Sequence, residues 1–94
     1  DNVIVLMFSE FGRRVRDNGS GTDHGAAGAA FVIGDAVKGA QYGEFPSMKP
    51  EDLQQGDLVP NMDFRGLYTT VLEDWLGLDA KPIVKGNFEA PRFL

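Results

Sequence analysis

The sequence predicts an α/β fold, because it contains two strands of the buried type and one amphipathic helix. An apolar run without alternation covers residues 3–8, and a second one covers residues 29–33. Uninterrupted apolar runs of this length are typical of strands that are covered on both faces, as in a parallel α/β sheet. Apolar residues also recur at helical spacing over residues 64–76. This pattern predicts a helix that packs against such a sheet.

The 94 residues are fewer than this architecture requires. A strand buried on both faces needs neighbouring strands and two covering layers, whereas the chain offers one other strand and one clear helix. Small domains bury a modest share of their surface even when they are complete. We therefore expect residues 1–94 to be a single fragment, the C-terminal piece of a larger α/β domain. Its core would be completed by the upstream part of the same protein or by a partner chain.

The first strand, residues 3–8, is followed at once by polar residues. In open α/β sheets, ligands bind outside the carboxyl ends of the strands, and Glu10 is expected at such an end. A glycine-rich segment over residues 9–28 reads as a long loop, and long loops are frequently functional. This loop is long enough to return Asp23 and His24 to the same edge.

Two helical signals follow the second strand. Pro50, followed by acidic residues, predicts one or two helical turns. Asp63 is a good N-cap for the longer helix, and Gly77 is a good stop. The apolar stripe of this helix consists of Phe64, Leu67, Tyr68, Val71, Leu72, Trp75 and Leu76. Prolines then interrupt regular structure, so residues 78–94 are expected to form an extended tail.

The composition excludes several classes of function. Nine Lys and Arg against fourteen Asp and Glu give a net charge of −5, which argues against a general binder of nucleic acid or anionic membranes. Cysteine is absent, so disulfides and thiolate metal sites are excluded. No apolar segment approaches the roughly 20 residues that span a bilayer. Dinucleotide, P-loop and serine-hydrolase motifs are also absent.

Glu10, Asp23 and His24 form the compact set of candidate metal ligands. Carboxylate oxygens suit Ca, Mg or Mn, and imidazole suits Zn, so the expected cofactor is a divalent metal of one of these kinds. His24 is the single histidine, and further ligands would have to come from elsewhere. Structural alternatives exist for two of the three. Glu10 could cap a helix or pair with an arginine, and Asp23 could organise a turn through its side chain.

A basic cluster formed by Arg13, Arg14 and Arg16 lies beside these candidate ligands. A guanidinium group matches phosphate or sulfate in two-point geometry. Arg13 lies nearest to the end of the strand and is the candidate for contact with an anionic ester substrate. Alternatively, the three arginines neutralise Glu10 and Asp17 on a solvated surface.

Five ordered motifs resemble a known family. They are Ser9 to Arg14, Gly21 to Gly25, Phe31 to Gly34, Val37 to Gly39 and Tyr42 to Pro46. The resemblance is to the C-terminal part of the domain-of-unknown-function family 1501, and it extends to residue 77. That family is similar in fold to the alkaline phosphatase and sulfatase superfamily, a large α/β sandwich with a metal site at strand carboxyl ends. Its members are typically bacterial and carry a twin-arginine export signal, which implies a periplasmic or exported location.

The resemblance also implies roles for individual residues. The segment around Glu10 is similar to the Ser-Asp-Asn-Gly segment of sulfatases, so Glu10 would replace a metal-binding aspartate. Asp23 and His24 resemble a later segment that supplies a histidine to the metal or the substrate. Phe11 occupies a position where the superfamily has a polar ligand, and Ala26-Ala27 offers no second imidazole. The nucleophile would lie upstream of residue 1.

Our leading interpretation is that the chain is part of an exported sulfatase-like or phosphatase-like protein. Glu10, Asp23 and His24 would contribute to a metal-assisted site that hydrolyses a phosphate or sulfate ester, with His24 and Arg13 in catalytic roles. The fragment alone is expected to be inactive. The alternative is a non-catalytic relative that acts as a binding or scaffold protein, in which Asp23 and His24 belong to a structural hydrogen-bond network.

Overall fold

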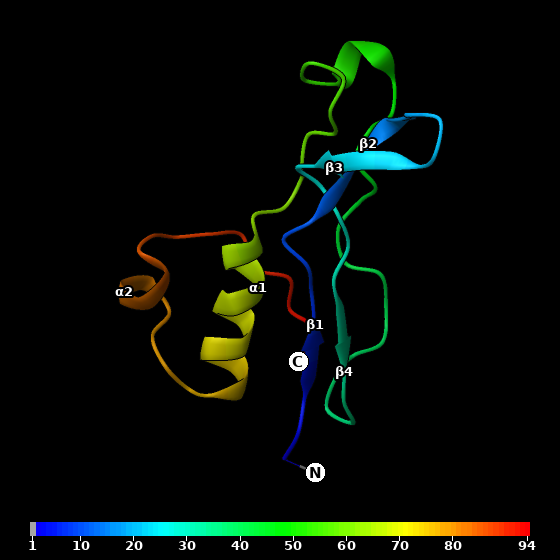
Figure 1. Cartoon of the computed structure of the whole chain (residues 1–94). Coiled ribbons are helices and arrows are strands. Elements are labelled where there is room, and N and C mark those ends of the chain that lie inside the picture. Colours follow the sequence, from blue (N-terminus) through cyan, green and yellow to red (C-terminus); the bar gives the residue numbers. More distant parts are fainter. Residues whose placement is uncertain (1) are drawn as a thin grey trace.

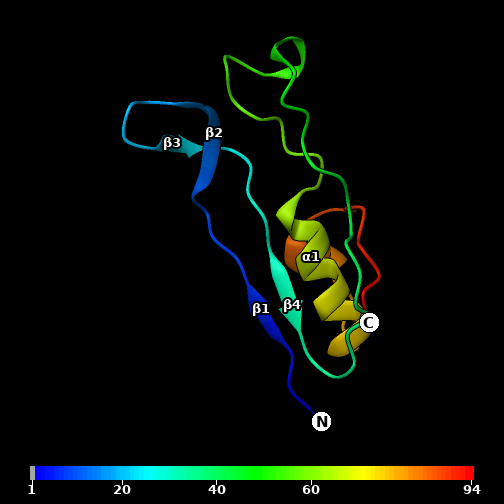
Figure 2. The same cartoon turned by 90° about the vertical axis from the view of Figure 1, so that its right-hand side faces the viewer.

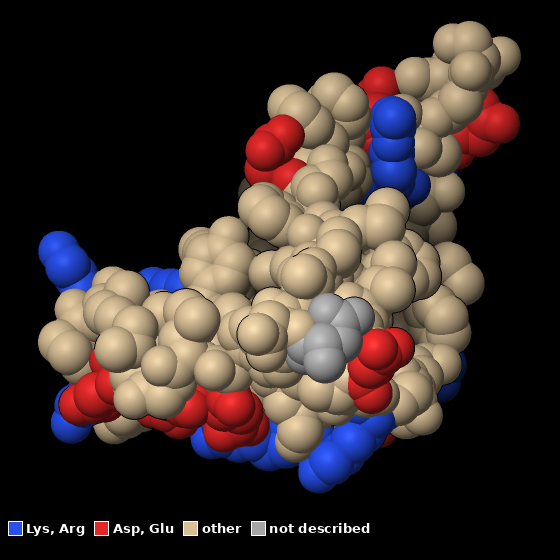
Figure 3. Space-filling view, turned by 90° about the horizontal axis from the view of Figure 1, so that it is seen from below, with Lys and Arg blue, Asp and Glu red and all other residues tan. Residues whose placement is uncertain are grey.

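A strand pair with a helix on one side and a hairpin at one end make up the molecule in the computed structural model, which describes residues 2–94 (Figures 1 and 2). In chain order the elements are β1 (Val5–Met7), β2 (Gly12–Asp17), β3 (Thr22–Gly25), β4 (Phe31–Ile33), η1 (Pro50–Asp52), α1 (Phe64–Thr70), η2 (Val71–Trp75) and α2 (Lys81–Val84). The molecule is elongated, with extents of 45 × 27 × 19 Å. Seen from below, it has a broad area of uncharged residues with most charged side chains near its rim (Figure 3).

Strands β1 and β4 pair antiparallel, with Leu6 opposite Val32. The chain leaves β1, passes through the hairpin and returns along β4, without the crossover helix that a parallel pair needs. The expectation of parallel strands covered on both faces is therefore not met within residues 2–94. Leu6 and Val32 are half-buried, whereas their neighbours in both strands are exposed. The larger alkaline-phosphatase-like sandwich stays a prediction.

The segment expected to be a long loop, residues 9–28, contains a β-hairpin instead. Strands β2 and β3 pair antiparallel, with Arg13 opposite His24. The turn between them closes when the amide of Asn18 donates to the carbonyl of Gly21 at 2.7 Å, and Gly19 takes a φ of 103°. The two central residues of this turn are Gly19 and Ser20, and a Gly-Ser pair between two strands is a hairpin signal. Because both strands are mainly polar, the alternating apolar residues that usually flank such a turn are missing from the sequence.

Helix α1 begins at its expected N-cap. The carboxylate of Asp63 accepts a hydrogen bond from the backbone nitrogen of Arg65 at 2.9 Å and forms an ion pair with its guanidinium at 2.6 Å. The hydrogen bond from the Arg65 side chain is the largest cause that lowers the pKa of Asp63, to about 2. The N-cap carboxylate therefore stays charged at neutral and mildly acidic pH.

The predicted helix over residues 64–76 is confirmed, with one change in its hydrogen bonding. After α1 the chain continues as the π-helical segment η2, in which the amide of Leu76 donates to the carbonyl of Val71 at 3.0 Å. Gly77 follows with a φ of 67°. Glycine adopts this left-handed conformation at little cost, so it ends the helix as expected.

The C-terminal segment links α1 to the chain that follows β4. Phe93 is 2% exposed and makes an edge contact with the ring of Tyr42 at 6.2 Å. The carbonyl of Phe93 accepts a hydrogen bond from the amide of Lys38 at 2.7 Å. On the helix, the fully buried hydroxyl of Thr70 donates to the carbonyl of Pro91 at 2.6 Å. These contacts fix the C-terminal segment between helix α1 and the chain that follows β4.

The expected extended tail, residues 78–94, contains one short helix. Helix α2 has a proline at its start, where the missing amide hydrogen would have had no partner in the helix, so proline begins this helix and does not break it. Beyond α2 the tail has no helix or strand up to Leu94. Arg92 holds it to η2 through Asp74 at 3.2 Å and Glu73 at 3.4 Å. The hydrogen bond to Asp74 is the main cause that raises the pKa of Arg92.

The substitution Thr70→Val tests the link between α1 and the C-terminal segment. Valine keeps the shape of threonine but leaves the carbonyl of the half-buried Pro91 without this donor, which costs about 1 kcal/mol, the lower end of the penalty for an unpaired buried group. Thr69→Val is the matched control, since the Thr69 hydroxyl donates to the carbonyl of Arg65 within its own helix. Urea denaturation should show a clearly larger loss of the unfolding free energy for Thr70→Val. Equal losses in the two variants would contradict this role of Thr70.

Candidate functional site

The β2–β3 hairpin carries the residues that the sequence singles out for chemistry, and it projects from one end of the molecule (Figure 1). Strand β1 leads towards it, so polar residues do follow the carboxyl end of the first strand. Glu10 lies in the bend before β2, and Asp23 and His24 lie on β3; all three are exposed. The hairpin therefore presents these side chains to solvent and not to an enclosed cleft.

Asp23 and His24 have different surroundings although they are consecutive. Neighbouring side chains in a strand point to opposite faces, so the two groups do not converge on one point. Asp23 accepts a hydrogen bond from the side-chain amide of Asn18 at 2.8 Å. The His24 ring packs against the ring of Phe11, with 4.8 Å between centroids. The contact from Asn18 agrees with the alternative role of Asp23, the organisation of a turn.

Arg13 and His24 are brought together. They are cross-strand partners, and side chains of directly opposite residues lie on the same face of an antiparallel pair. The guanidinium of Arg13 donates to the carbonyl of Thr22 at 2.8 Å. Arg14 donates to the carbonyl of Gln55, and Arg16 is exposed. Of the arginine cluster, Arg13 is thus the member that shares a face with the candidate histidine.

The candidate ligands do not form a complete metal site by themselves. Within residues 2–94, no three His, Cys, Asp or Glu side chains lie close enough together to hold a metal ion. Glu10 and His24 would each need ligands from another segment, because structural metal sites take four or more ligands and catalytic zinc takes three from the protein. The residues present therefore do not fit a divalent metal as a self-contained centre.

Asp57 fixes the base of the hairpin, a role that the sequence did not indicate. Its carboxylate accepts hydrogen bonds from the amides of Ala26 at 3.1 Å and Leu58 at 2.8 Å. Glycines allow the close approach: a Cβ on Gly25 would lie 2.5 Å from the Asp57 carboxylate, and a Cβ on Gly12 would lie 2.2 Å from the carbonyl of Ala27. The one signal in the sequence is the Gly56-Asp57 pair, which is typical of a turn.

The outer face of the strand pair is a second candidate site. The cross-strand pairs Val5 with Ile33 and Met7 with Phe31 lie on one side of β1 and β4. These four apolar side chains are 46–63% exposed. The opposite side, with Leu6, faces α1. The strand pair therefore has one covered face and one open apolar face.

A family model described as "Protein of unknown function (DUF1501)" matches residues 1–92. No curated protein matches the chain, and no solved structure matches it either. Among the helices of residues 2–94, none has the length and apolar character that crossing a membrane requires.

The substitution Asp57→Ala tests how the hairpin is anchored. It removes two hydrogen bonds to a carboxylate, a type of bond that contributes about 1.5–3 kcal/mol when it is protected from water. Asp57 is half-buried, so we expect Asp57→Ala to lower the free energy of local hairpin opening by an amount near the lower end of this range. The Arg13 amide, which donates to the carbonyl of Ala27, should lose about tenfold in hydrogen-exchange protection.

Asp35→Ala is the matched control for Asp57→Ala, because it removes the same charge from an exposed carboxylate after β4. It should leave the protection of the Arg13 amide unchanged. An equal effect of both variants would show that net charge, and not the anchor, determines hairpin stability.

Proposed function

The chain belongs to the DUF1501 family of proteins of unknown function, since the family model covers 92 of its 94 residues, and from this premise we propose that it is a docking module. In this role the outer face of β1 and β4 binds a further polypeptide segment, which completes an α/β core. The segment belongs to the upstream part of the same protein or to a partner chain. The membership agrees with the family that the sequence motifs predicted.

The observation that carries this proposal is the open apolar face of the strand pair. Val5, Met7, Phe31 and Ile33 lie side by side on it, and each is about half exposed or more. Single exposed apolar residues are ordinary on soluble proteins, but contiguous apolar patches mark interaction sites. Both strands also belong to a two-stranded sheet, so each has one edge without a neighbouring strand among residues 2–94. An added helix or strand would cover the face, and an added strand would also pair with an edge.

The size of the exposed surface supports the same proposal. A folded monomer of this mass exposes about 5,300 Å², whereas the chain exposes 7030 Å². Its radius of gyration is 15.3 Å, against about 12.4 Å for a compact domain of this length. The excess area is of the size that one partner contributes to an obligate interface, about 1,000–2,500 Å². An interface of standard size, about 800 Å² per partner, would leave much of this excess uncovered.

Photo-crosslinking tests the docking proposal in the host that produces the protein. Benzoylphenylalanine in place of Met7 or Phe31 should form crosslinks to one defined polypeptide segment, identified by mass spectrometry. The same probe in place of Phe45, which is 85% exposed and outside the strand pair, is the control. Crosslinks at positions 7 and 31 no more frequent than at position 45 would contradict the proposal.

A charge on the outer face should abolish docking. With the crosslinking probe at Val5, the substitution Phe31→Asp should lower the crosslinked fraction at least about tenfold, because a carboxylate would be transferred into an apolar interface. Phe45→Asp adds the same charge elsewhere and should leave the fraction unchanged.

A second candidate function is metal-assisted hydrolysis of a phosphate or sulfate ester, with the hairpin as one side of the site. The contact between the rings of Phe11 and His24 favours it, because this contact holds the imidazole next to the segment that carries Glu10. Arg13 lies opposite His24, where its guanidinium could hold the anionic group of an ester. In this proposal Glu10 and His24 provide two ligands and another segment supplies the rest, whereas Asp23, on the opposite face of β3, organises the turn through Asn18. The periplasmic or exported location belongs to the same proposal.

Metal analysis tests this second function separately from docking. Protein purified from its host without chelator should contain a divalent metal and should hydrolyse 4-nitrophenyl phosphate or sulfate. Glu10→Ala and His24→Ala should each weaken metal binding at least about tenfold, because the loss of even a residue that only supports a metal ligand typically costs about 10–100-fold. Arg13→Ala should lower turnover with the metal retained. Asp35→Ala is the control. Unchanged metal content in both ligand variants would rule out this function and would leave docking unaffected.

A further inference from the structure

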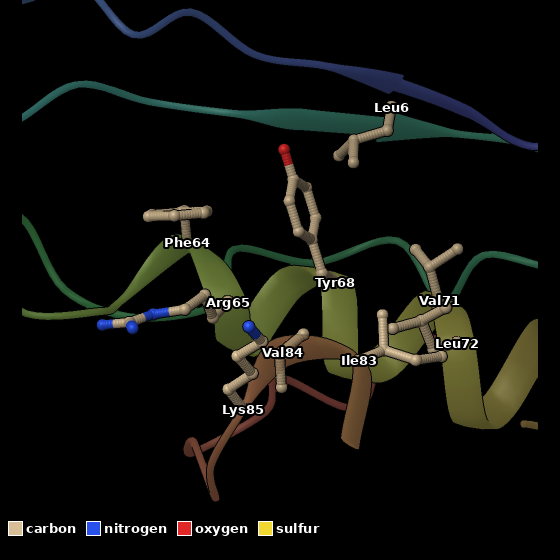
Figure 4. A pocket seen from close by; sticks show the side chains of 9 residues that line it. All are labelled: Leu6, Phe64, Arg65, Tyr68, Val71, Leu72, Ile83, Val84 and Lys85. Carbon is tan, nitrogen blue, oxygen red and sulfur yellow. The ribbon is translucent and has the colours of Figure 1, made fainter. Parts of the chain in front are cut away.

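An open groove of about 470 Å³ lies between β1, α1 and α2, on the side of the strands opposite to the outer face (Figure 4). Its walls are apolar, with Leu6 from β1, Tyr68 from α1, Val71 from η2 and Ile83 from α2. The Tyr68 ring points from the helix towards the strands, and Leu6 points back towards the helix (Figure 4). The volume falls within the range of about 300–1,000 Å³ that is typical of small-molecule sites.

The rim of this groove carries two cations, of which one is available. The guanidinium of Arg65 is bound to Asp63 by two hydrogen bonds and lies over the Phe88 ring, 4.2 Å from its centroid. Lys85 takes part in no ion pair among residues 2–94, and its ammonium group reaches from the end of α2 towards α1 (Figure 4). The groove thus combines an apolar interior with one free positive charge.

The backbone of Lys85 adds an independent observation. Lys85 adopts a left-handed conformation, with φ 60° and ψ 50°, which costs a residue with a Cβ about 1–2 kcal/mol. Glycine is the usual residue at this position after a helix. Residues held in such sparsely populated conformations are concentrated at ligand-binding and active sites. The conformational cost of a left-handed lysine agrees with a role of its side chain in ligand binding at the groove.

We propose that this groove binds an amphiphilic small molecule with an apolar body and a single anionic group, of the aliphatic carboxylate type. The aliphatic chain would lie between Leu6 and Ile83, and the carboxylate would contact the ammonium of Lys85. A cationic head group would be repelled there, because the available charge at the rim is positive, and a neutral head group could accept a hydrogen bond but would form no ion pair. This proposal goes beyond docking, since the groove and the outer face lie on opposite sides of β1.

Titration of the 94-residue chain with decanoate, followed by amide chemical shifts in NMR, tests this proposal. Decanoate should bind with saturation and shift the amides of residues around the groove, including Leu6 and Val71. Decylammonium should bind more weakly than decanoate. Lys85→Met should weaken decanoate binding about two- to fivefold, the usual effect of one exposed charge, and should change decanol binding by a smaller factor. Lys49→Met, an exposed lysine outside the groove, should change neither.

Two further variants separate the groove from general hydrophobic binding. Ile83→Asp places a carboxylate in the groove wall at a half-exposed position and should abolish decanoate binding, whereas Leu78→Asp, at a similarly exposed position outside the groove, should not. Lys85→Gly should lose the preference for decanoate over decanol and should have a Tm at least equal to that of the wild type, because it relieves the left-handed strain. A lower Tm would mean that the lysine has a structural role.

Three results would overturn the proposal. The first is the absence of saturable decanoate binding to the folded chain. The second is equal weakening of decanoate and decanol by Lys85→Met, which would show that the charge is not recognised. The third is a set of shifted amides around Val5, Met7 and Phe31 in place of the groove, which would assign the binding to the outer face.

Discussion

The structure depends on one constraint, that a single helix can cover a single face of a two-stranded sheet. Helix α1 occupies the inner face of β1 and β4, and the C-terminal segment is fixed to this helix through Thr70 and to the chain after β4 through Phe93. Helix α1 and the C-terminal segment therefore lie on the same, inner side of the strands (Figure 2). The outer face of the strands consequently has apolar side chains but no cover among residues 2–94. The proposed docking function is a direct consequence of this imbalance.

Part of the secondary structure could be predicted from local patterns, whereas the larger α/β sandwich stays a prediction. The N-cap at Asp63, the helical period and the stop at Gly77 are encoded within a few residues, and the structure confirms them. The positions of both strands were also predictable from their apolar runs, with shorter bounds than expected. The antiparallel direction of β1 and β4 was not predictable. It depends on the hairpin between them, whose mainly polar strands pair through the turn at Asn18. Burial of a strand on both faces depends on neighbours that a run of apolar residues cannot specify.

The sequence indicated which residues belong to the candidate site, but it indicated less about how they are arranged. Sequence proximity suggested that Asp23 and His24 act together, but their alternation along β3 directs them to opposite faces, and Asp23 is bound to Asn18. The pairing of Arg13 with His24 depends on the register of the hairpin, which sequence reasoning did not provide. Asp57 was missed because it is 31 residues from its partner Ala26. Contacts of this kind leave no local pattern.

The most direct test of the account is the solvent accessibility of the outer face in the protein as its host produces it. The chain has no cysteine, so a single cysteine in place of Met7 reports on this face alone, and a cysteine in place of Phe45 reports on free surface. If a further segment covers the outer face, maleimide should label the cysteine at position 7 at least about tenfold more slowly than the cysteine at position 45, as local opening would then be required. Equal labelling rates at the two positions would contradict the account.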